Sequence, residues 1–425
     1  MKNWREYKKF HFIGIGGIGM SASARLLKTH NRIVSGSDGT QSDITDALAK
    51  EGISIHIGHD AANVSLDVDC VVYTLAIDDD NPELVIAKEK HIPTYTYAEM
   101  LGNISRDLKT IVVAGTHGKT TTTAMTHAAL RAAKMDPTMI VGSLIFEKKK
   151  KTNYIDGSSN LFVVEACEYK KSFLNLSPEI LVITNIEADH LDFYKDIDDI
   201  KQAFMQLADK VPKDGKIICD FDDENTLEIR KKHKNKVLNY RIYLDSVPEL
   251  KVFGEYNRLN AAAAMAVAHM LGSNLKKTQK GLKKFKGTWR RMESHGKNKK
   301  GALLFDDYAH HPTEIRASLK AVKENFPDKT IVVFFQPHLY SRTKTLFNEF
   351  VDALKSVDEL FLLPIYAARE PLDESISSEI LAEKIEGAQL IQNFGEARVE
   401  IQKKEKNSVV ITIGAGDIEY VLRDL

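Results

Sequence analysis

The segment best suited to chemistry is a glycine-rich loop that carries a lysine and several hydroxyl side chains. Its residues are Gly115, Thr116, His117, Gly118, Lys119, Thr120 and Thr121. The loop lies between the apolar stretch 110–114, which predicts a strand, and a stretch that predicts a helix. In this setting backbone N–H groups hold nucleotide phosphates, the lysine contacts the outer phosphates, and the threonine hydroxyl can bind Mg²⁺. The spacing from Gly115 to Gly118 is shorter than in the common phosphate loop, so we interpret the segment as a variant nucleotide site.

Candidate metal ligands follow the next predicted strands. Glu165 ends the apolar stretch 161–165, and Asp189 and His190 come shortly after the stretch 180–184. Ligands of open α/β sheets lie at the carboxyl ends of strands, and Mg²⁺ prefers oxygen ligands. Glu165 is therefore a candidate Mg²⁺ ligand, with a capping or salt-bridging acid as the alternative. His190 is either a ligand or a hydrogen-bond donor.

A second glycine cluster lies near the N-terminus, again between a predicted strand and a predicted helix. It contains Gly14, Gly16, Gly17 and Gly19, and Asp38 follows at the distance where an acid can reach a ribose hydroxyl. Such a cluster lets the backbone and a helix N-terminus approach a diphosphate. The alternatives are a tight turn without a ligand and the nicotinamide site of an oxidoreductase. Two phosphate loops in separate domains predict two phosphorylated ligands, whereas a simple dehydrogenase needs one.

Basic and polar side chains that suit anions are concentrated in the last third of the chain. Arg290 and Arg291 could stabilise charge on a transferred phosphoryl group, or form a surface pair without a role. The segments 306–312 and 335–343 each follow a predicted strand and are richer in polar residues than packing requires. We therefore predict a site at these two strand ends.

Short β-branched stretches alternate with helical stretches along the chain, which is typical of parallel α/β sheets. Predicted strands cover 10–15, 33–35, 70–74, 110–114, 161–165, 180–184, 302–306, 330–335, 359–363 and 409–412. Predicted helices cover 21–28, 260–271 and 276–286. The lysine run 148–151 predicts a solvated hairpin tip or loop, and the segment 294–300 predicts a polar turn.

These elements predict three consecutive α/β domains, with a boundary in the polar segment 103–107 and another near 294–300. We expect a Rossmann-like N-terminal domain over 1–107, a central P-loop ATPase-type domain over 108–293, and a third α/β domain over 294–425.

The composition excludes several classes of protein. The 425 residues include 59 basic and 59 acidic side chains, so the chain has no net charge with which to hold nucleic acid or an anionic membrane. No apolar stretch approaches the roughly 20 residues that a membrane span needs. Cys70, Cys167 and Cys219 are widely spaced, which argues against a disulfide framework and a cysteine-only zinc site. We expect a cytoplasmic enzyme without a secretory signal that binds neither nucleic acid nor membranes.

Six motifs in the chain resemble, in the same order, those of the Mur ligases of bacterial cell-wall synthesis. They cover 11–20, 115–121, 184–190, 254–261, 306–312 and 335–338. The resemblance extends over essentially the whole chain and implies a UDP-sugar domain, a central ATPase domain and a Rossmann-like C-terminal domain that receives an amino acid. It also implies that ATP and Mg²⁺ drive ligation of L-alanine to UDP-N-acetylmuramate through an acyl phosphate. The enzyme would act as a monomer or a homodimer.

The resemblance also implies roles for individual residues. Catalytic roles would fall to Lys119, His190, Arg290 and Arg291, and metal ligation to Thr120, Glu165 and His190. Asn257, Asn260 and Asp307 would bind ATP together with residues 115–121. The UDP-sugar would contact Gly14, Gly16, Gly17, Gly19, Met20, Asp38 and His59. The pocket for the amino acid and the muramoyl carboxylate would contain His310, His338 and Arg342.

The sequence departs from the common family pattern at a few positions. Leu339 stands where many relatives have arginine, and Glu165-Ala166-Cys167-Glu168-Tyr169 replaces the frequent Glu-Ala-Asp-Glu-Ser. No spacing argues for a histidine partner of Cys167, so we interpret it as a buried structural cysteine and not a nucleophile.

Three alternative functions remain at this point. They are a recycling ligase that attaches a preformed peptide to UDP-N-acetylmuramate, an NAD-dependent oxidoreductase, and a non-catalytic UDP-sugar sensor. Lys119 of the loop 115–121 argues against the oxidoreductase, because a dehydrogenase needs no triphosphate site. Discrimination among L-alanine, glycine and L-serine stays open, because the three differ by small groups.

Overall fold

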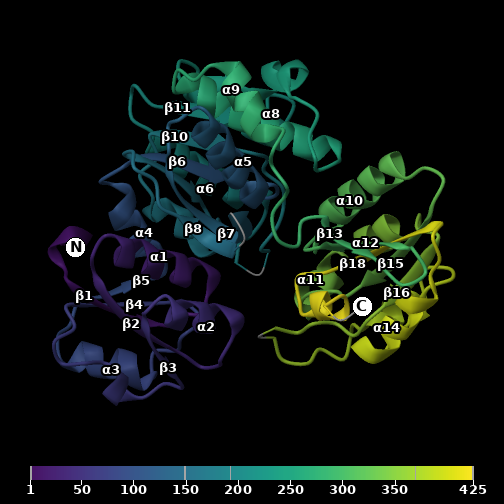
Figure 1. Cartoon of the computed structure of the whole chain (residues 1–425), viewed down its shortest axis with the longest axis horizontal. Helices are drawn as coiled ribbons and strands as arrows, with labels where there is room; N and C mark the ends of the chain where they lie inside the picture. Colours follow the sequence, from purple (N-terminus) through teal and green to yellow (C-terminus); the bar gives the residue numbers. More distant parts are fainter. Residues whose placement is uncertain (1, 148–149, 192, 369, 424–425) are drawn as a thin grey trace. The chain divides into compact units, whose positions relative to one another are not determined.

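Three β-sheets with flanking helices organise the chain (Figure 1). They are seen in a computed structural model, which describes residues 2–147, 150–191, 193–368 and 370–423. Each sheet is parallel or mixed, and each follows the preceding one along the sequence. The prediction of three α/β domains is therefore confirmed.

The first sheet is parallel, with the strand order β3-β2-β1-β4-β5 of Rossmann-like folds. Its strands are β1 (Lys9–Ile13), β2 (Ile33–Asp38), β3 (Ser54–Ile57), β4 (Cys70–Tyr73) and β5 (Thr94–Thr96). Its helices are η1 (Trp4–Glu6), α1 (Ile18–Thr29), α2 (Asp43–Lys50), η2 (Ala61–Asn63), α3 (Pro82–Glu89) and α4 (Tyr97–Ser105). Side-chain caps fix several helix starts; before α3, for example, Asn81 accepts hydrogen bonds from the backbone N–H groups of Glu83 and Leu84.

The second sheet has the strand order β12-β11-β10-β6-β9-β7-β8 and is parallel except for the β7–β8 hairpin. Its strands are β6 (Lys109–Ala114), β7 (Thr138–Glu147), β8 (Lys150–Ile155), β9 (Leu161–Glu165), β10 (Ile180–Ile183), β11 (Lys216–Cys219) and β12 (Val237–Asn239). Its helices are α5 (Lys119–Ala132), η3 (Tyr169–Asn175), α6 (Ile197–Asp209), η4 (Glu224–Thr226), α7 (Leu227–Lys232), η5 (Tyr240–Ser246), α8 (Glu255–Met270) and α9 (Leu275–Leu282).

The β7–β8 hairpin contains the lysine run that we predicted as a hairpin tip or loop. Glu147 pairs with Lys150 at the end of this antiparallel ladder, and Lys148 and Lys149 lie outside the described residues. The central strands β6, β9 and β10 are buried almost throughout, because the β-branched side chains of a parallel sheet are covered on both faces.

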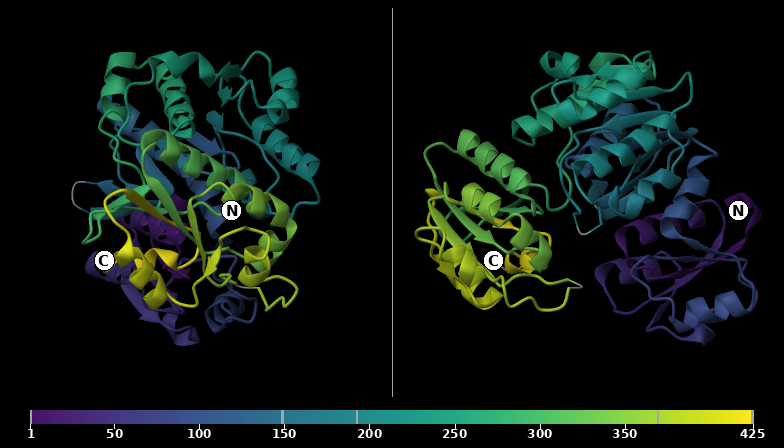
Figure 2. Two further views of the ribbon diagram at one scale, coloured as in Figure 1. Left: turned by 90° about the vertical axis from the view of Figure 1, so that its right-hand side faces the viewer. Right: turned by 180° about the vertical axis from the view of Figure 1, so that it is seen from behind.

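The third sheet has the strand order β13-β14-β18-β15-β16-β17 and is parallel except for β13. Its strands are β13 (Glu293–Lys297), β14 (Leu303–Asp307), β15 (Thr330–Phe335), β16 (Glu359–Leu362), β17 (Gln389–Leu390) and β18 (Ser408–Ile413). Its helices are α10 (Pro312–Asn325), α11 (Tyr340–Thr345), α12 (Phe347–Leu354), α13 (Ser378–Ala382), α14 (Phe394–Lys403) and η6 (Ile418–Val421). Helices cover both faces, with α10 and α12 on one core and α14 and η6 on the other (Figure 2).

Two segments that we predicted as polar connections are structured instead. Residues 103–105 belong to α4, where Asn103 is buried and accepts a hydrogen bond from the Trp4 backbone N–H at 3.2 Å. Most of the predicted turn 294–300 is strand β13, which pairs antiparallel with β14. The prediction of a turn was wrong because an exposed edge strand needs few apolar residues.

The chain forms two compact units. One comprises Met1–Glu249 with Leu259–Phe285, and the other comprises Leu250–Arg258 with Lys286–Leu425. The first two sheets share the first unit, in which side chains of both contribute to one hydrophobic core. The domain boundaries at 107/108 and 293/294 stay predictions.

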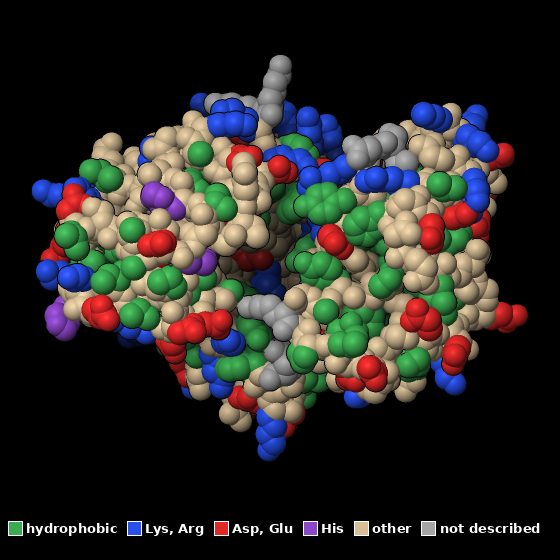
Figure 3. Space-filling model, turned by 90° about the horizontal axis from the view of Figure 1, so that it is seen from below, with side chains coloured by type: hydrophobic (Ala, Val, Ile, Leu, Met, Phe, Trp, Pro, Cys, Tyr) green, Lys and Arg blue, Asp and Glu red, His purple; other side chains and the backbone are tan. Residues whose placement is uncertain are grey.

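The surface carries charges of both signs. On the face drawn in Figure 3, basic and acidic side chains lie among apolar and uncharged ones. Among the described residues, we find no helix with both the length and the apolar character that a bilayer crossing requires.

Candidate functional site

The phosphate loop connects β6 to α5, as the sequence predicts. Two glycines make the turn possible, because Gly115 has φ 138° and Gly118 has φ 80°. A side chain at either position would also overlap a neighbour, the Thr184 hydroxyl at Gly115 and the Asn260 amide oxygen at Gly118. The backbone N–H groups at the start of α5 are consequently presented without a side-chain cap.

Lys119 folds back over this loop. Its Nζ donates to the carbonyl oxygens of Gly115 at 2.6 Å and Thr116 at 2.9 Å, and to Glu168 Oε1 at 3.0 Å. Burial lowers the pKa of Lys119, but the Glu168 carboxylate outweighs this effect and raises the pKa above its ordinary value. The ammonium group therefore stays charged where a phosphate would arrive.

Thr120 and Glu165, two of the predicted metal ligands, lie in direct contact. The Thr120 hydroxyl donates to Glu165 Oε1 at 2.9 Å, and the Gly142 backbone N–H donates to Glu165 Oε2 at 2.6 Å. Glu165 is thus held at the end of β9 by a neighbouring strand and by the helix that follows the loop. A hydroxyl and a carboxylate side by side are the oxygen donors that Mg²⁺ prefers.

His190, the third predicted ligand, belongs to a neighbouring cluster around Glu168. Its Nε2 lies 3.7 Å from Glu168 Oε1 and 3.8 Å from Asp189 Oδ2, and its ring packs on Tyr169 with centroids 4.9 Å apart. His190 has φ 54°, a left-handed conformation that costs free energy in a non-glycine residue and is common at functional sites.

Glu168 is a functional residue that our sequence reasoning missed. It is 3% exposed, and its Oε2 is buried without a hydrogen-bond partner among the described residues. An unsatisfied buried carboxylate oxygen beside a lysine and a histidine suits a cation or a ligand donor. The signal that could have identified it is the second acid of the Glu-Ala-Cys-Glu segment after β9.

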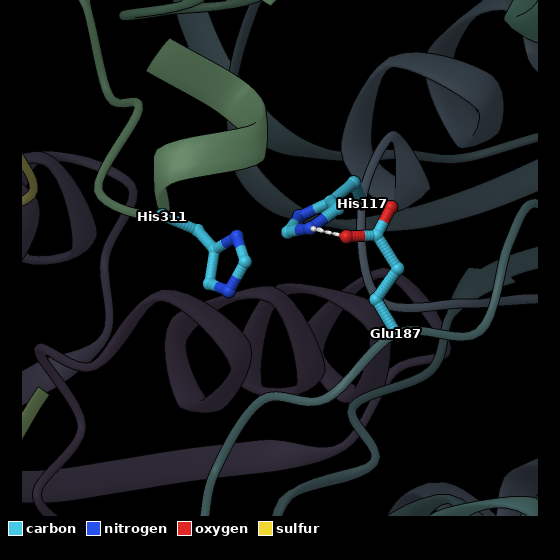
Figure 4. Close-up of side chains that lie close together, drawn as sticks. All are labelled: His117, Glu187 and His311. Carbon is cyan, nitrogen blue, oxygen red and sulfur yellow. Dashed lines mark ion pairs between the residues drawn. The ribbon is translucent and has the colours of Figure 1, made fainter. Parts of the chain in front are cut away.

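Polar groups of the β10 loop hold the remainder of the phosphate loop. The Asn185 side chain accepts from the His117 backbone N–H at 2.9 Å, and the Thr184 hydroxyl donates to the His117 carbonyl at 2.5 Å. The His117 ring forms an ion pair with Glu187, with Nε2 3.6 Å from Oε2 (Figure 4). Residues that follow β10 therefore support the conformation of the phosphate loop.

Asn257 and Asn260, the predicted nucleotide pair, both lie on α8 and are buried. Asn260 Oδ1 accepts from the Thr122 hydroxyl at 3.0 Å, which places this side chain against the phosphate-loop helix. Asn257 donates from Nδ2 to the Phe253 carbonyl at 2.8 Å.

The N-terminal glycine loop connects β1 to α1. Gly14 has φ 81°, and the backbone N–H groups of Gly14 and Ile15 both donate to the Ser37 carbonyl at 2.9 Å. Asp38 Oδ2 accepts from the Gly16 N–H at 2.8 Å, so the predicted ribose-binding acid already supports the loop. The Met20 side chain is buried in the core, which leaves only its backbone for a ligand.

A buried carboxylate lies behind this loop and connects it to His59. Glu83 Oε1 lies 3.1 Å from His59 Nδ1, and its Oε2 accepts from the Ser37 hydroxyl at 2.7 Å. His11 Nε2 approaches Oε2 at 2.7 Å, and Asn63 donates to Oε1 at 3.1 Å. Burial alone would raise the pKa of Glu83, but these hydrogen bonds outweigh it and lower the pKa to about 2. Glu83 was absent from our sequence predictions.

The two candidate arginines, Arg290 and Arg291, have different environments in the structure. Arg290 is 3% exposed, and its guanidinium donates to Asp306 at 2.8 Å and to the carbonyls of Gly416 and Gly414 at 2.7 and 2.5 Å. All its side-chain nitrogens therefore donate to groups within the second unit, and its predicted role at a transferred phosphoryl group stays a prediction. Arg291 is more exposed and contacts Glu314 at 3.4 Å.

Asp307 ends β14 in a buried position. Its carboxylate accepts from the Ser318 hydroxyl at 2.5 Å and from the Ala309 N–H at 3.1 Å. Burial raises the pKa of Asp307 to about 6, and the hydrogen bond from Ser318 opposes this effect. Its contact with the ATP ribose stays a prediction.

The three residues predicted for the amino-acid pocket lie together at strand ends of the third sheet. Arg342 Nη1 is 3.2 Å from His338 Nδ1, and the rings of His310 and His338 have centroids 6.1 Å apart. Tyr366, which sequence reasoning missed, stacks on His338 with centroids 5.7 Å apart. Leu339 has φ 72°, a strained conformation for a leucine, and directs the chain into α11.

Family models match three successive parts of the chain. Residues 9–109 match "Mur ligase family, catalytic domain", residues 113–246 match "Mur ligase middle domain", and residues 290–416 match "Mur ligase, glutamate ligase domain". The chain belongs to the Mur ligase family. It is therefore a ligase of peptidoglycan precursor synthesis, and Mur ligases use ATP. This membership favours ligation over the oxidoreductase alternative.

Relatives within the Mur ligases are similar over nearly the full length. UDP-N-acetylmuramate–L-alanine ligases of Clostridium kluyveri and Clostridium novyi are 42% and 43% identical; the matches cover 97% of this chain and 97% and 96% of those proteins. The crystal structure of UDP-N-acetylmuramate–alanine ligase from Thermotoga maritima aligns with a TM-score of 0.81 at 30% identity, covering 98% of this chain and 97% of that one. A murein peptide ligase from Psychrobacter arcticus shares the fold, with a TM-score of 0.72 at 20% identity, covering 98% of this chain and 99% of that one.

Cys167 is a residue at which the sequence departs from the common family pattern after β9. The side chain is exposed, so our prediction of a buried cysteine was wrong. Reduced hydration within the surrounding protein and the nearby Glu168 carboxylate raise the pKa of the Cys167 thiol to about 11. A thiol that stays protonated at neutral pH is a poor nucleophile, in agreement with a non-catalytic role.

Proposed function

We propose that this chain catalyses the ATP-dependent ligation of L-alanine to the carboxylate of UDP-N-acetylmuramate. The observation that carries the proposal is the sequence identity of 42% and 43%, over 97% of the chain, to two ligases named for this reaction. The phosphate loop, the second glycine loop and the His310–His338–Arg342 cluster match the three ligands that the reaction requires. A preformed-peptide ligase is the second candidate, because a murein peptide ligase has the same fold.

The chemistry requires activation of a carboxylate. A carboxylate is a poor electrophile, so the terminal phosphoryl group of ATP is transferred to a muramoyl carboxylate oxygen, and ADP leaves. The amine of L-alanine then attacks the carbonyl carbon of the acyl phosphate. The tetrahedral intermediate expels phosphate, and the ammonium proton is lost to give the amide.

Lys119 is the residue that we assign to the transferred phosphoryl group. Negative charge grows on the phosphoryl oxygens during transfer, and a fixed cation stabilises that charge more than it stabilises the ground state. Glu168 orients the Lys119 ammonium at 3.0 Å and keeps it charged. We assign a second contact to Arg291, because it is more exposed than Arg290 and its ion pair with Glu314 is longer, at 3.4 Å, than the 2.8 Å pair of Arg290 with Asp306.

Thr120 and Glu165 suit a Mg²⁺ ion that accompanies ATP, and His190 and Glu168 offer further donors beside them. The fit rests on the paired hydroxyl and carboxylate at 2.9 Å and on the buried Glu168 oxygen that has no hydrogen-bond partner among the described residues. A bound Mg²⁺ would neutralise phosphate charge and orient the phosphoryl group for in-line transfer.

The third-domain cluster suits the amino-acid substrate. Arg342 would pair with the carboxylate of L-alanine, because a guanidinium binds a carboxylate with two parallel hydrogen bonds. His310 and His338 would contact the amine or the muramoyl carboxylate, and Tyr366 would limit the space available to the amino-acid side chain.

We further propose that the enzyme acts in the cytoplasm on small molecules, as a monomer or a homodimer. Three free cysteines and the need for ATP and UDP-sugars support a reducing, nucleotide-rich compartment. The balanced charge supports a preference for small substrates over nucleic acid. Light scattering during size-exclusion chromatography would distinguish the two oligomeric states.

The decisive experiment measures phosphate release from ATP in the presence of Mg²⁺ and UDP-N-acetylmuramate, with either L-alanine or a preformed tripeptide, the substrate of the recycling alternative, added separately. We expect release with L-alanine, dependent on the UDP-sugar, and formation of the UDP-sugar–alanine product by mass spectrometry. Release only with the tripeptide would establish the recycling alternative. Binding of the UDP-sugar without release from either mixture would leave a sensor. Glycine and L-serine in parallel reactions measure selectivity.

A further inference from the structure

The β7–β8 hairpin of the central sheet contacts the helix of the N-terminal glycine loop. β8 is the edge strand of its sheet, and α1 packs against β7 and β8. The hairpin contacts both ends of α1. Asn153 contacts the first turn of α1, and the Tyr154 hydroxyl lies 2.6 Å from Oγ1 of Thr29, the last residue of α1.

Asn153 makes the contact nearest the glycine loop. Its Nδ2 donates to the Ile18 carbonyl at 2.5 Å and to the Ser21 hydroxyl at 2.8 Å, and its Oδ1 accepts from Arg25 Nη1 at 2.7 Å. Asn153 and Ser21 are both fully buried. Ile18 directly follows Gly17, the residue that precedes the first turn of α1, so this amide is one residue away from the loop that would hold the diphosphate.

Arg25 connects the same amide to the next helix of the N-terminal domain. Its Nε donates to Glu51 Oε2 at 2.9 Å, and its Nη2 donates to Glu51 Oε1 at 3.0 Å. Arg25 is only 8% exposed, so its contact with the buried Asn153 amide is dehydrated, whereas its partner Glu51 is exposed to solvent. Removal of the Asn153 amide would leave the Arg25 guanidinium, the Ile18 carbonyl and the Ser21 hydroxyl each with one hydrogen-bond partner fewer.

The opposite strand of the hairpin contacts the phosphate site. The ladder is regular at Ile140↔Tyr154 and resumes at Ile145↔Thr152, so residues 141–144 bulge opposite Asn153. Gly142 lies in this bulge and donates its N–H to Glu165. The bulge at residues 141–144 therefore lets Gly142 contact Glu165, the candidate Mg²⁺ ligand, while Asn153 on the opposite strand contacts α1.

We propose that Asn153 is a positioning residue that fixes the N-terminal glycine loop, and hence the UDP-sugar, with respect to Glu165 of the phosphate site. The identity of the ligand in this inference rests on the proposed function, whereas the immobilisation of the loop does not. Both strands of the hairpin serve this role, because β7 holds the carboxylate and β8 holds α1.

Hydrogen exchange without any ligand tests the positioning directly. In Asn153→Ala, we expect the backbone N–H groups of a peptide covering 14–21 to exchange about tenfold faster than in the wild type, because loss of the buried amide leaves its partners unsatisfied. Tyr154→Phe is the matched control: it removes a hydroxyl from the same strand at the far end of α1, and residues 14–21 should exchange as in the wild type.

Binding of UDP-N-acetylmuramate, measured by titration calorimetry, supplies the functional readout. We expect the Kd to rise about tenfold in Asn153→Ala, with the KM for ATP within about twofold of the wild type. Asn153→Asp keeps the acceptor for Arg25 but loses the donor to Ile18, and we expect it to weaken binding as strongly as Asn153→Ala. If Asn153→Ala fails to fold, Ser21→Ala removes one acceptor of the same amide and should raise the Kd about threefold.

Each outcome is decisive. Wild-type exchange of residues 14–21 in folded Asn153→Ala, or equal acceleration in Tyr154→Phe, would overturn the inference. Where Asn153→Ala does not fold, an unchanged Kd in Ser21→Ala would overturn it. Accelerated exchange in Asn153→Ala alone, together with a wild type that does not bind the UDP-sugar, would support the positioning role and refute the proposed function.

Discussion

The two glycine loops of the first unit share a strand–loop–helix plan but are supported by groups of opposite charge. In the N-terminal loop, the Asp38 carboxylate accepts from Gly16, and the buried Glu83 holds Ser37, whose carbonyl receives two loop N–H groups. In the phosphate loop, the Lys119 ammonium donates to two loop carbonyls.

This difference shows how one backbone plan can serve two purposes. Carboxylates that accept from loop N–H groups shape a loop for recognition but add no positive charge to it. A lysine that donates to loop carbonyls occupies none of the loop N–H groups itself and adds a cation beside them. Phosphoryl transfer needs that cation, whereas binding of a UDP-sugar needs shape and hydrogen bonds.

Replacement of Lys119 tests the cationic loop and should have the largest effect. We expect Lys119→Ala to lower the rate of phosphate release about 10³-fold, because a preorganised charge in the transition state is lost. The assay is phosphate release with saturating L-alanine and UDP-sugar. Lys276→Ala, at an exposed lysine of α9, is the control and should be as active as the wild type. A loss below tenfold would contradict the role of the cation.

Replacement of Glu83 tests the anionic support. The folded pKa of about 2 lies below the ordinary 4.5, so the stabilisation is present above pH 4.5 and is lost as the pH falls toward 2. We expect Glu83→Gln to lower the free energy of unfolding by about 3 kcal/mol at pH 7, and by about half that at pH 3. Urea denaturation at pH 7 and at pH 3 measures both free energies of unfolding.

Glu89→Gln, on the exposed end of the same helix α3, is the matched control and should change stability little at either pH. A Glu83→Gln effect that is equal at pH 7 and pH 3 would show that the loss comes from packing and not from the charge.

Replacement of Glu168 tests how much of the function of Lys119 depends on its carboxylate partner. We expect Glu168→Gln to lower kcat about 30-fold, because the ammonium loses the charged hydrogen bond that orients it. Steady-state kinetics measure this effect, and Glu228→Gln on the exposed face of α7 is the control. Wild-type kcat in Glu168→Gln would show that the loop carbonyls alone position Lys119.

Replacement of Asp38 should have the smallest effect. Asp38→Asn keeps an acceptor for the Gly16 N–H, so we expect the Kd for UDP-N-acetylmuramate to stay within about threefold of the wild type. Asp38→Ala removes the acceptor and should raise the Kd about tenfold. Calorimetric titration distinguishes these results. Equal losses in both variants would mean that the carboxylate charge itself contacts the ligand.

Much of the fold was predictable because buried strands have a strong local signal. All ten predicted strands are present, and β6 and β9 match the predicted bounds at their carboxyl ends. The missed strands include β3, β13 and β17, which are short, carry exposed residues and lie at sheet edges. β3 does alternate apolar and polar residues from Ile53 to Ile57, a signal that we did not use, whereas β13 and β17 have no periodic apolar pattern and depend on a neighbouring strand for their pairing.

The candidate site was predictable where a motif contains its own contacts. The turn of the phosphate loop and the lysine that folds onto it lie within five residues. Glu83 and Glu168 were missed because their partners come from distant segments; His11 and Glu83, for example, are 72 residues apart. The choice between Arg290 and Arg291 likewise depended on Asp306 and on two carbonyls more than 120 residues away.

By itself the sequence determined the three α/β domains, the two glycine loops and the chemistry of a lysine beside nucleotide phosphates, because each is encoded in contiguous residues. The tertiary structure alone decided which charges support which loop, which arginine is immobilised, and that Asn153 of the central sheet contacts the first turn of α1, next to the N-terminal loop. The physical reason is that dehydration and unsatisfied partners give buried polar groups their energetic weight, and both arise only when distant segments pack together.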